Sequence, residues 1–133
     1  MHETVHFVRR YPLSVLCLAL IALLSFTPFF PETPLDGVEF IDKWTHLVMY
    51  GGTCSVIWWE YLRSHDRIDR GRLLLWAVAG MTALGGIVEL LQAYCTTTRS
   101  GEWLDFWADT IGVLTGTLAG WLMNVSYFKR PVN

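Results

Sequence analysis

Long apolar stretches alternate with short charged segments along this chain. The first uncharged run reaches from Tyr11 to Phe30, and three further apolar runs of similar length follow it. A helix of about 20 apolar residues is long enough to cross the hydrocarbon core of a bilayer. The pattern therefore predicts membrane-spanning helices over residues 11–30, 44–62, 73–94 and 103–128. We expect an all-α fold in which four transmembrane helices form an antiparallel bundle, within a single domain over residues 1–133.

The first run also has a feature of secretory signal peptides, because Arg9 and Arg10 precede it. It is long for the apolar region of a signal peptide, and no small-residue cleavage site follows it. We therefore interpret it as an uncleaved helix, with Pro12 in its first turn. The second run is the least regular of the four, because His46 and the glycine pair 51–52 interrupt its apolar character.

Basic residues alternate between rich and poor segments. The N-terminal segment, the loop at 63–72 and the C-terminal segment are rich in Arg and Lys, whereas the loops at 31–43 and 95–102 hold few. Cytoplasmic loops of membrane proteins carry the excess of Lys and Arg. We therefore expect both termini and the middle loop to be cytoplasmic and the other two loops to lie outside.

Composition agrees with a membrane protein and narrows the class of partner. The 133 residues are 53% hydrophobic and 17% charged, and the mean hydropathy is +0.35. A soluble domain of this size needs more polar residues to cover its surface. The net charge of −2 argues against nucleic acid as a partner. Cys17, Cys54 and Cys95 form no CxxC pair and no metal-ligand spacing, so we interpret them as small buried thiols.

Polar residues gather at the outer ends of the second, third and fourth predicted helices. Asp42, His46 and Tyr50 are four residues apart and share one helix face. Glu89 and Gln92 lie near the outer end of the third run. Ionisable groups inside a membrane need partners or water, and they mark functional sites. We therefore predict one polar pocket, open to the outside, built from Asp42, Lys43, His46, Tyr50, Glu89, Gln92, Arg99, Asp105 and Asp109.

The fourth run carries an acidic stripe that continues as a glycine stripe. Glu102, Asp105 and Asp109 are followed at the same helical spacing by Gly112 and Gly116, and then by a glycine at 120. Small residues let helices approach closely in lipid, so this stripe should face the bundle. Acids also outnumber bases in the predicted pocket. At least one carboxyl should therefore be protonated, a cation should bind, or the histidine should be charged.

Three stretches, DKWTHLVMY, ELLQAYCTTTRSGEWLDFWAD and IGVLTGTLAG, together resemble the VanZ-like family of small bacterial membrane proteins. The shared pattern is D-K-x-x-H-x-x-x-Y, then E-x-x-Q, an Arg, an Asp with a polar residue four places later, and Gly beyond. The match covers roughly residues 42–120, about three-fifths of the chain. Many family members carry Asn at the position of Asp109. Because Asp can carry a negative charge and Asn cannot, the resemblance does not by itself imply a purely hydrogen-bonding role for Asp109.

The resemblance implies a multi-pass protein of the bacterial cytoplasmic membrane with a role in the cell envelope. The founding member of the family is associated with low-level resistance to the glycopeptide antibiotic teicoplanin. We expect the pocket to recognise or modify an envelope lipid or the lipid group of a glycopeptide antibiotic. In this hypothesis His46 and the carboxylates supply general acid–base chemistry, while Lys43 and Arg99 hold an anionic headgroup.

Other functions fit the same residues. The pocket could belong to a non-catalytic binding module or a proton-coupled permeation module. The polar network could also serve only to fix helix packing or to dock a partner protein. The chain has no GxSxG or HExxH motif, so the sequence leaves enzymatic activity open, and we predict no cofactor. A metal ion held by His46, Glu89, Asp105 and Asp109 is chemically feasible, although their spacing matches no defined metal motif.

Overall fold

A computed structural model describes residues 1–27, 34, 37, 40–97 and 101–133. Over these residues the regular elements are helices, which confirms the all-α prediction. In chain order they are α1 (His2–Arg10), α2 (Pro12–Phe26), α3 (Ile41–Ser64), α4 (Arg70–Leu73), η1 (Leu74–Gly80), α5 (Met81–Cys95), α6 (Trp103–Met123) and η2 (Asn124–Phe128). The two π-helical segments were not predicted. η1 joins α4 to α5, and η2 extends α6.

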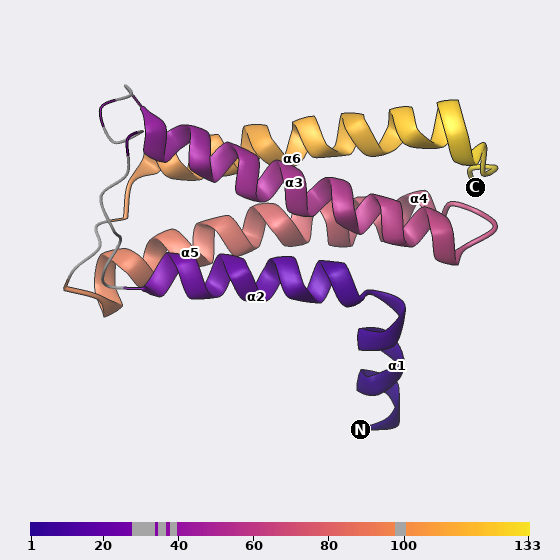
Figure 1. Ribbon diagram of the computed structural model, residues 1–133, viewed down its shortest axis with the longest axis horizontal. Helices are drawn as coiled ribbons and strands as arrows, with labels where there is room; N and C mark the ends of the chain where they lie inside the picture. Colours follow the sequence, from indigo (N-terminus) through magenta and orange to yellow (C-terminus); the bar gives the residue numbers. More distant parts are fainter. Residues whose placement is uncertain (28–33, 35–36, 38–39, 98–100) are drawn as a thin grey trace.

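The long helical segments lie side by side and run in alternating directions along the molecule (Figure 1). They are α2, α3, the continuous segment α4–η1–α5, and α6 with η2. α3 is the central element, because it contacts α2, η1 and α6, and its contact with α6 is the most extensive of the fold. α1, which the sequence analysis did not predict, turns away from α2 by 94° (Figure 1).

Two helices of the described residues are long and apolar enough to cross a membrane, Arg70–Cys95 and Trp103–Phe128. Counting the bent pair α1 and α2 as one span gives a third. The span predicted at 44–62 forms a helix, α3, but that helix is not among those that meet the criteria of length and composition. Polar residues lower its hydropathy, and several of them, such as Thr53 and Glu60, are buried against neighbouring helices.

Apolar side chains cover much of the outside of the helices, and several charged side chains lie in the interior beside an apolar core. Large apolar side chains such as Leu16, Leu23 and Trp76 are exposed along the helices, whereas Glu60 and Asp109 are buried. Soluble proteins place charged residues at the surface. In membrane helices, ionisable side chains face the bundle interior instead. The distribution therefore agrees with the composition in indicating a membrane protein.

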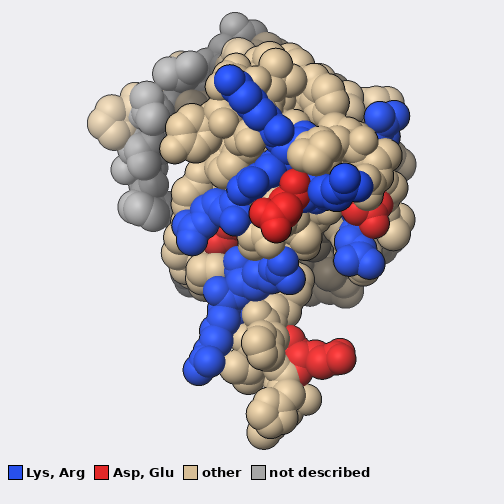
Figure 2. Space-filling view, turned by 90° about the vertical axis from the view of Figure 1, so that its right-hand side faces the viewer, with Lys and Arg blue, Asp and Glu red and all other residues tan. Residues whose placement is uncertain are grey.

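The two ends of the bundle differ in charge. We call the end where α3 stops and α4 begins the basic end. It carries the arginines and lysines of α1, of the 63–72 segment and of the C-terminal segment (Figure 1). Figure 2 looks onto this end and shows Lys and Arg side chains crowded over it. The opposite end, where α3 and α6 begin and α5 ends, we call the acidic end.

A buried carboxylate fixes the start of α2. Glu60 of α3 accepts hydrogen bonds from the backbone amides of Leu13 and Ser14, each at 2.9 Å, and from the Ser14 hydroxyl at 2.7 Å. These amides belong to the first turn of α2, whose N–H groups lack partners within the helix. Arg10 at the end of α1 donates to the carbonyl of Ser64 at 2.6 Å. Both contacts tie the bent α1–α2 unit to the end of α3.

The glycine stripe of α6 faces α3, as the sequence predicts. A Cβ added at Gly116 would lie 2.5 Å from the carbonyl oxygen of Gly51, and one at Gly112 would lie 2.5 Å from the carbonyl oxygen of Leu47. The absence of side chains therefore allows the two backbones to approach closely. Asp109 is one turn before this stripe on the same face, so the close packing directs its carboxylate toward α3.

Candidate functional site

His46 of α3 lies between carboxylates from two other helices at the acidic end. Its Nδ1 atom is 2.8 Å from Oδ1 of Asp109 on α6 and 4.0 Å from Oε1 of Glu89 on α5. Its Nε2 atom is 3.7 Å from Oδ2 of Asp105 on α6. We call these four residues the histidine cluster. Their positions in the sequence are far apart, and the α3–α5–α6 packing brings them together as the sequence analysis expected.

Lys43, one turn before His46, is enclosed by three carboxylates. Its Nζ atom is 2.6 Å from Asp42, 2.5 Å from Glu102 and 2.5 Å from Asp105. Burial disfavours the charged form, but hydrogen bonds to Asp105, Asp42 and Glu102 outweigh it and raise the pKa of Lys43, which precedes the predicted span. An ammonium group has three N–H donors. The Lys43 ammonium, which we expected to hold an anionic headgroup, is therefore bound by three acids of the protein itself.

Glu89 connects the end of α5 to the start of α6. Its Oε2 atom accepts a hydrogen bond of 2.8 Å from the backbone amide of Glu102. Its Oε1 atom faces His46 and has no hydrogen-bond partner among the described residues. An ion pair of Glu89 with Lys43 or Arg99 was one expectation. Lys43 pairs with the other acids instead, and Arg99 lies outside the described residues.

Two further buried oxygens at the cluster have no hydrogen-bond partner in the described part of the chain. They are the Tyr50 hydroxyl and Oδ2 of Asp109, and both residues are 0% exposed. Gly85 of α5 provides the space for Asp109, since a Cβ there would lie 3.0 Å from Oδ2. A buried polar atom without a partner costs about 1–3 kcal/mol. Such atoms are rare in native folds, and their explanations include strain, a catalytic role and a bound water or ion.

Gln92 was predicted to line the same site, and its amide is used elsewhere. The Nε2 atom donates a hydrogen bond of 2.8 Å to the backbone carbonyl of Ser25 near the end of α2. Gln92 is buried, and it lies one turn beyond Glu89 on α5. This contact ties the end of α2 to the end of α5, and it gives the side chain a structural role.

The polar residues form a continuous path from the surface into the bundle. The Asp42 side chain is 58% exposed, whereas that of His46 is 14% exposed and that of Asp109 is fully buried. Exposed aromatic residues surround the same end of the bundle, namely Trp44, Tyr94, Trp103 and Trp107. Trp and Tyr are enriched where membrane proteins cross the headgroup region. The acidic end therefore carries the aromatic side chains that are typical of a membrane–water interface.

Two sets of residues at this end could hold a metal ion. One set, Asp42, Glu102 and Asp105, already surrounds the Lys43 ammonium. The other set consists of His46, Glu89 and Asp109, whose ligand atoms all lie within 4.8 Å of one another. Only this second set combines an imidazole with two carboxylates, and it has no Lys or Arg partner among the described residues.

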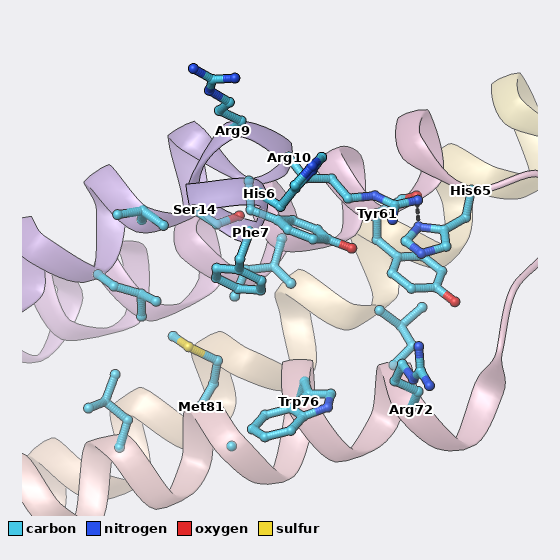
Figure 3. A pocket seen from close by; sticks show the side chains of 17 residues that line it. His6, Phe7, Arg9, Arg10, Ser14, Tyr61, His65, Arg72, Trp76 and Met81 are labelled. Atoms are coloured by element: carbon cyan, nitrogen blue, oxygen red, sulfur yellow. Dashed lines mark hydrogen bonds between the residues drawn. The ribbon is translucent and has the colours of Figure 1, made fainter. Parts of the chain in front are cut away.

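A large groove lies at the basic end (Figure 3). It has a volume of about 1330 Å³, and its walls come from α1, α2, α3, α4, η1 and α5. Apolar side chains such as Leu18, Trp76 and Met81 form most of its lining, and Arg10 and Arg72 reach it from opposite sides (Figure 3). This groove was not predicted from the sequence, because it depends on the unpredicted turn between α1 and α2.

The acidic end combines proton-exchanging groups, an ordered ammonium and buried oxygens without partners. General acid–base catalysis uses His and carboxylate side chains within hydrogen-bond reach, as His46 and Asp109 are. Such a pair can also relay protons in membrane proteins. Comparison with known proteins adds no relative, because no family model, curated protein or solved structure matches this chain.

Proposed function

We propose that this chain is a four-span, VanZ-like protein of the bacterial cytoplasmic membrane that recognises or modifies a lipid-linked molecule of the cell envelope. The first, third and fourth spans are the bent α1–α2 unit, the α4–η1–α5 segment, and α6 with η2. α3 contains the second span, over residues 44–62, and Asp42 and Lys43 precede that span within the helix. The 24 residues of α3 reach about 36 Å at 1.5 Å per residue, which exceeds a hydrocarbon core of roughly 30 Å. The basic end faces the cytoplasm, by the positive-inside rule.

The contact between His46 and Asp109 carries this proposal. A 2.8 Å pair of imidazole and carboxylate, continuous with the surface and ringed by exposed Trp side chains, suits chemistry at the polar group of an amphiphile. An envelope lipid or the lipid-bearing part of a glycopeptide antibiotic has its polar group at that depth. His46 accepts or donates the proton, and Asp109 orients the ring.

The charge balance favours a neutral or cationic polar group in the ligand. Among the described residues, Asp42, Glu89, Glu102, Asp105 and Asp109 provide five carboxylates, against one ammonium from Lys43 and one imidazole. Because Lys43 is fully engaged with acids, it does not offer a free positive charge to a phosphate. An amine or hydroxyl of the ligand would instead find acceptors in the unpartnered carboxylate oxygens.

Variants at the histidine cluster test the proposal in cells. We expect Glu89→Gln and Asp109→Asn to abolish teicoplanin tolerance and to lower turnover of a labelled envelope lipid by about 10²–10⁴-fold, the usual contribution of a general acid or base. Asp66→Asn, a fully exposed acid at the basic end, is the matched control. Membrane insertion and thermal stability of each variant are measured in parallel.

The outcomes separate the alternatives. Loss of tolerance in folded, inserted variants supports a functional site, and turnover by the pure protein separates an enzyme from a binding module. Loss of folding in every cluster variant would favour a purely structural or partner-docking network. Full tolerance in both variants would refute the proposal.

A proton-coupled permeation module is the second candidate. The observation in its favour is the path of polar groups from exposed Asp42 to fully buried Asp109. Excess acid together with a histidine is typical of proton relays in transporters. Proteoliposomes loaded with a pH-sensitive dye test it. A proton flux that disappears in Asp109→Asn, but persists in Asp66→Asn, would favour this candidate over lipid modification.

A further inference from the structure

Two groups of acidic residues lie next to each other at the acidic end, and among the described residues only one of them contains a lysine or arginine. Lys43 pairs with each acid of that group, Asp42, Glu102 and Asp105. In the second group, the only ion-pair partner of Glu89 and Asp109 among the described residues is His46. Two buried carboxylates facing one imidazole leave a net negative charge in a region of low dielectric, and such a charge requires compensation.

Unpartnered oxygens are directed at this second group. Oε1 of Glu89 lies 4.0 Å from Nδ1 of His46 and has no hydrogen-bond partner in the described chain. The hydroxyl of Tyr50 also lacks a hydrogen-bond partner in the described chain, and Tyr50 is completely buried. Tyr50 lies one helical turn beyond His46 on α3. Tyr50 is not itself part of the charged group, so its open hydroxyl is an independent sign that a further species belongs here.

The surrounding contacts hold the candidate ligands as outer partners do in metal sites. The second ring nitrogen of His46 faces Asp105 at 3.7 Å, and Lys43 in turn holds Asp105. The second carboxylate oxygen of Glu89 accepts the backbone amide of Glu102. Metal-binding histidines are usually oriented by a carboxylate at their other nitrogen, and metal-binding carboxylates by hydrogen bonds.

We propose that Nδ1 of His46 and the carboxylates of Glu89 and Asp109 bind a divalent transition-metal ion. One imidazole and two carboxylates suit Zn²⁺ or Mn²⁺. Three protein ligands leave a coordination position for water or for a group of the ligand. The use of this metal in catalysis rests on the proposed function, whereas binding of the metal does not.

Metal binding by the purified, full-length protein tests this inference. The protein in detergent is stripped with a chelator and titrated with Zn²⁺ by calorimetry, and Mn²⁺ binding is followed by electron paramagnetic resonance. We expect one ion per chain. Glu89→Gln and Asp109→Asn should weaken binding by at least 100-fold, and Asp105→Asn by about 10–100-fold as an orienting residue. Asp66→Asn should bind like the parent protein.

Two controls keep the test decisive. Circular dichroism and size-exclusion chromatography show which variants fold, and the Tm of the parent protein should rise steadily as the Zn²⁺ concentration increases above the Kd. The metal site would be overturned if the folded parent protein showed no stoichiometric binding. It would also be overturned if Glu89→Gln and Asp109→Asn bound the metal as tightly as the parent protein. Lipid turnover that is insensitive to chelation would leave the proposed function standing while removing the metal from it.

The groove at the basic end carries a second inference independently of the histidine cluster. Its lining is apolar, and the basic side chains Arg10 and Arg72 approach Tyr61 and His65 from opposite sides of its mouth (Figure 3). Arg10 uses one of its five N–H donors for a backbone carbonyl at 2.6 Å, the only hydrogen bond of its guanidinium group among the described residues. An acyl chain fits the apolar walls, and a phosphate fits the basic mouth. We infer that an anionic phospholipid binds here.

Lipid titrations of the protein in nanodiscs test this second inference. We expect phosphatidylglycerol to bind more tightly than phosphatidylcholine, and Arg72→Gln to reduce that preference by about fivefold, the effect of one basic residue at a lipid surface. Arg67→Gln, an exposed arginine of the same end that does not line the groove, is the matched control. Equal binding of both lipids, or equal effects of the two variants, would refute it.

Discussion

Glu60 accepts three hydrogen bonds from the first turn of α2, two of them from the backbone amide and the hydroxyl of Ser14. An anion is favoured at a helix N-terminus, where unpaired N–H groups give a partial positive charge. Glu60→Gln replaces one acceptor oxygen by a donor that faces other donors. We expect a loss of about 1–3 kcal/mol in stability and a lower Tm in detergent. An unchanged Tm would show that the capping contact is dispensable.

The close contact of α3 with α6 predicts a marked difference between two glycines. Gly116→Ala should destabilise the protein by about 1–3 kcal/mol, because the new methyl group would meet the carbonyl of Gly51 and the side chain of Cys54. Gly52→Ala is the control, since no atom lies within 4 Å of a Cβ there. It should be neutral or stabilising by up to about 1 kcal/mol. Thermal unfolding of both variants measures the difference, and similar effects would contradict the packing.

The proposed orientation predicts which introduced cysteines react from outside the cell. Cys95 is exposed at the acidic end and is first replaced by serine. In that background, a membrane-impermeant maleimide should label Thr97→Cys in intact cells and should label Asp66→Cys only after lysis. Thr97 follows α5 at the acidic end, and Asp66 lies in the loop at the basic end. The reverse labelling would place the histidine cluster on the cytoplasmic side.

The contact between Asp42 and Lys43 predicts a stability loss in acid. A hydrogen bond from the Lys43 ammonium lowers the pKa of Asp42 below 3.8. A carboxyl with a lower pKa in the folded state stabilises the fold above its unfolded pKa, and this contribution disappears as the pH falls through the folded value. We therefore expect the Tm to fall as the pH decreases below about 4, and to fall less in Asp42→Asn. Parallel curves for the two proteins would contradict this linkage.

The sequence was most informative where helix periodicity and small residues act together. Asp109 and Gly116 share one face of α6, and the requirement that glycine face a neighbouring helix directed Asp109 toward the interior. His46 lies on the face of α3 that meets α6, where its ring contacts Asp109. Helical spacing determines which residues of a helix share a face. Residues on the facing sides of two packed helices could therefore be predicted to contact each other.

The sequence did not show which hydrogen-bond partner each buried polar side chain would have. Gln92 shares a face of α5 with Glu89, yet its amide binds the Ser25 carbonyl. Spacing alone cannot show which backbone carbonyl of another helix will lie within reach. Glu60 was missed although its signal was present, because a lone acid inside an apolar run requires a partner. That partner is the start of α2, which only the turn between α1 and α2 brings into contact.

The position of Lys43 among three acids limits the order in which this protein can accept substitutions during evolution. Replacing that one ammonium by a neutral residue would leave Asp42, Glu102 and Asp105 repelling one another across the junction of two helices. Each acid tolerates neutralisation more readily than the lysine does, since removing one still leaves the others paired. Natural descendants that lack the lysine should therefore also have lost acids at these positions, and the order of loss should begin with the carboxylates.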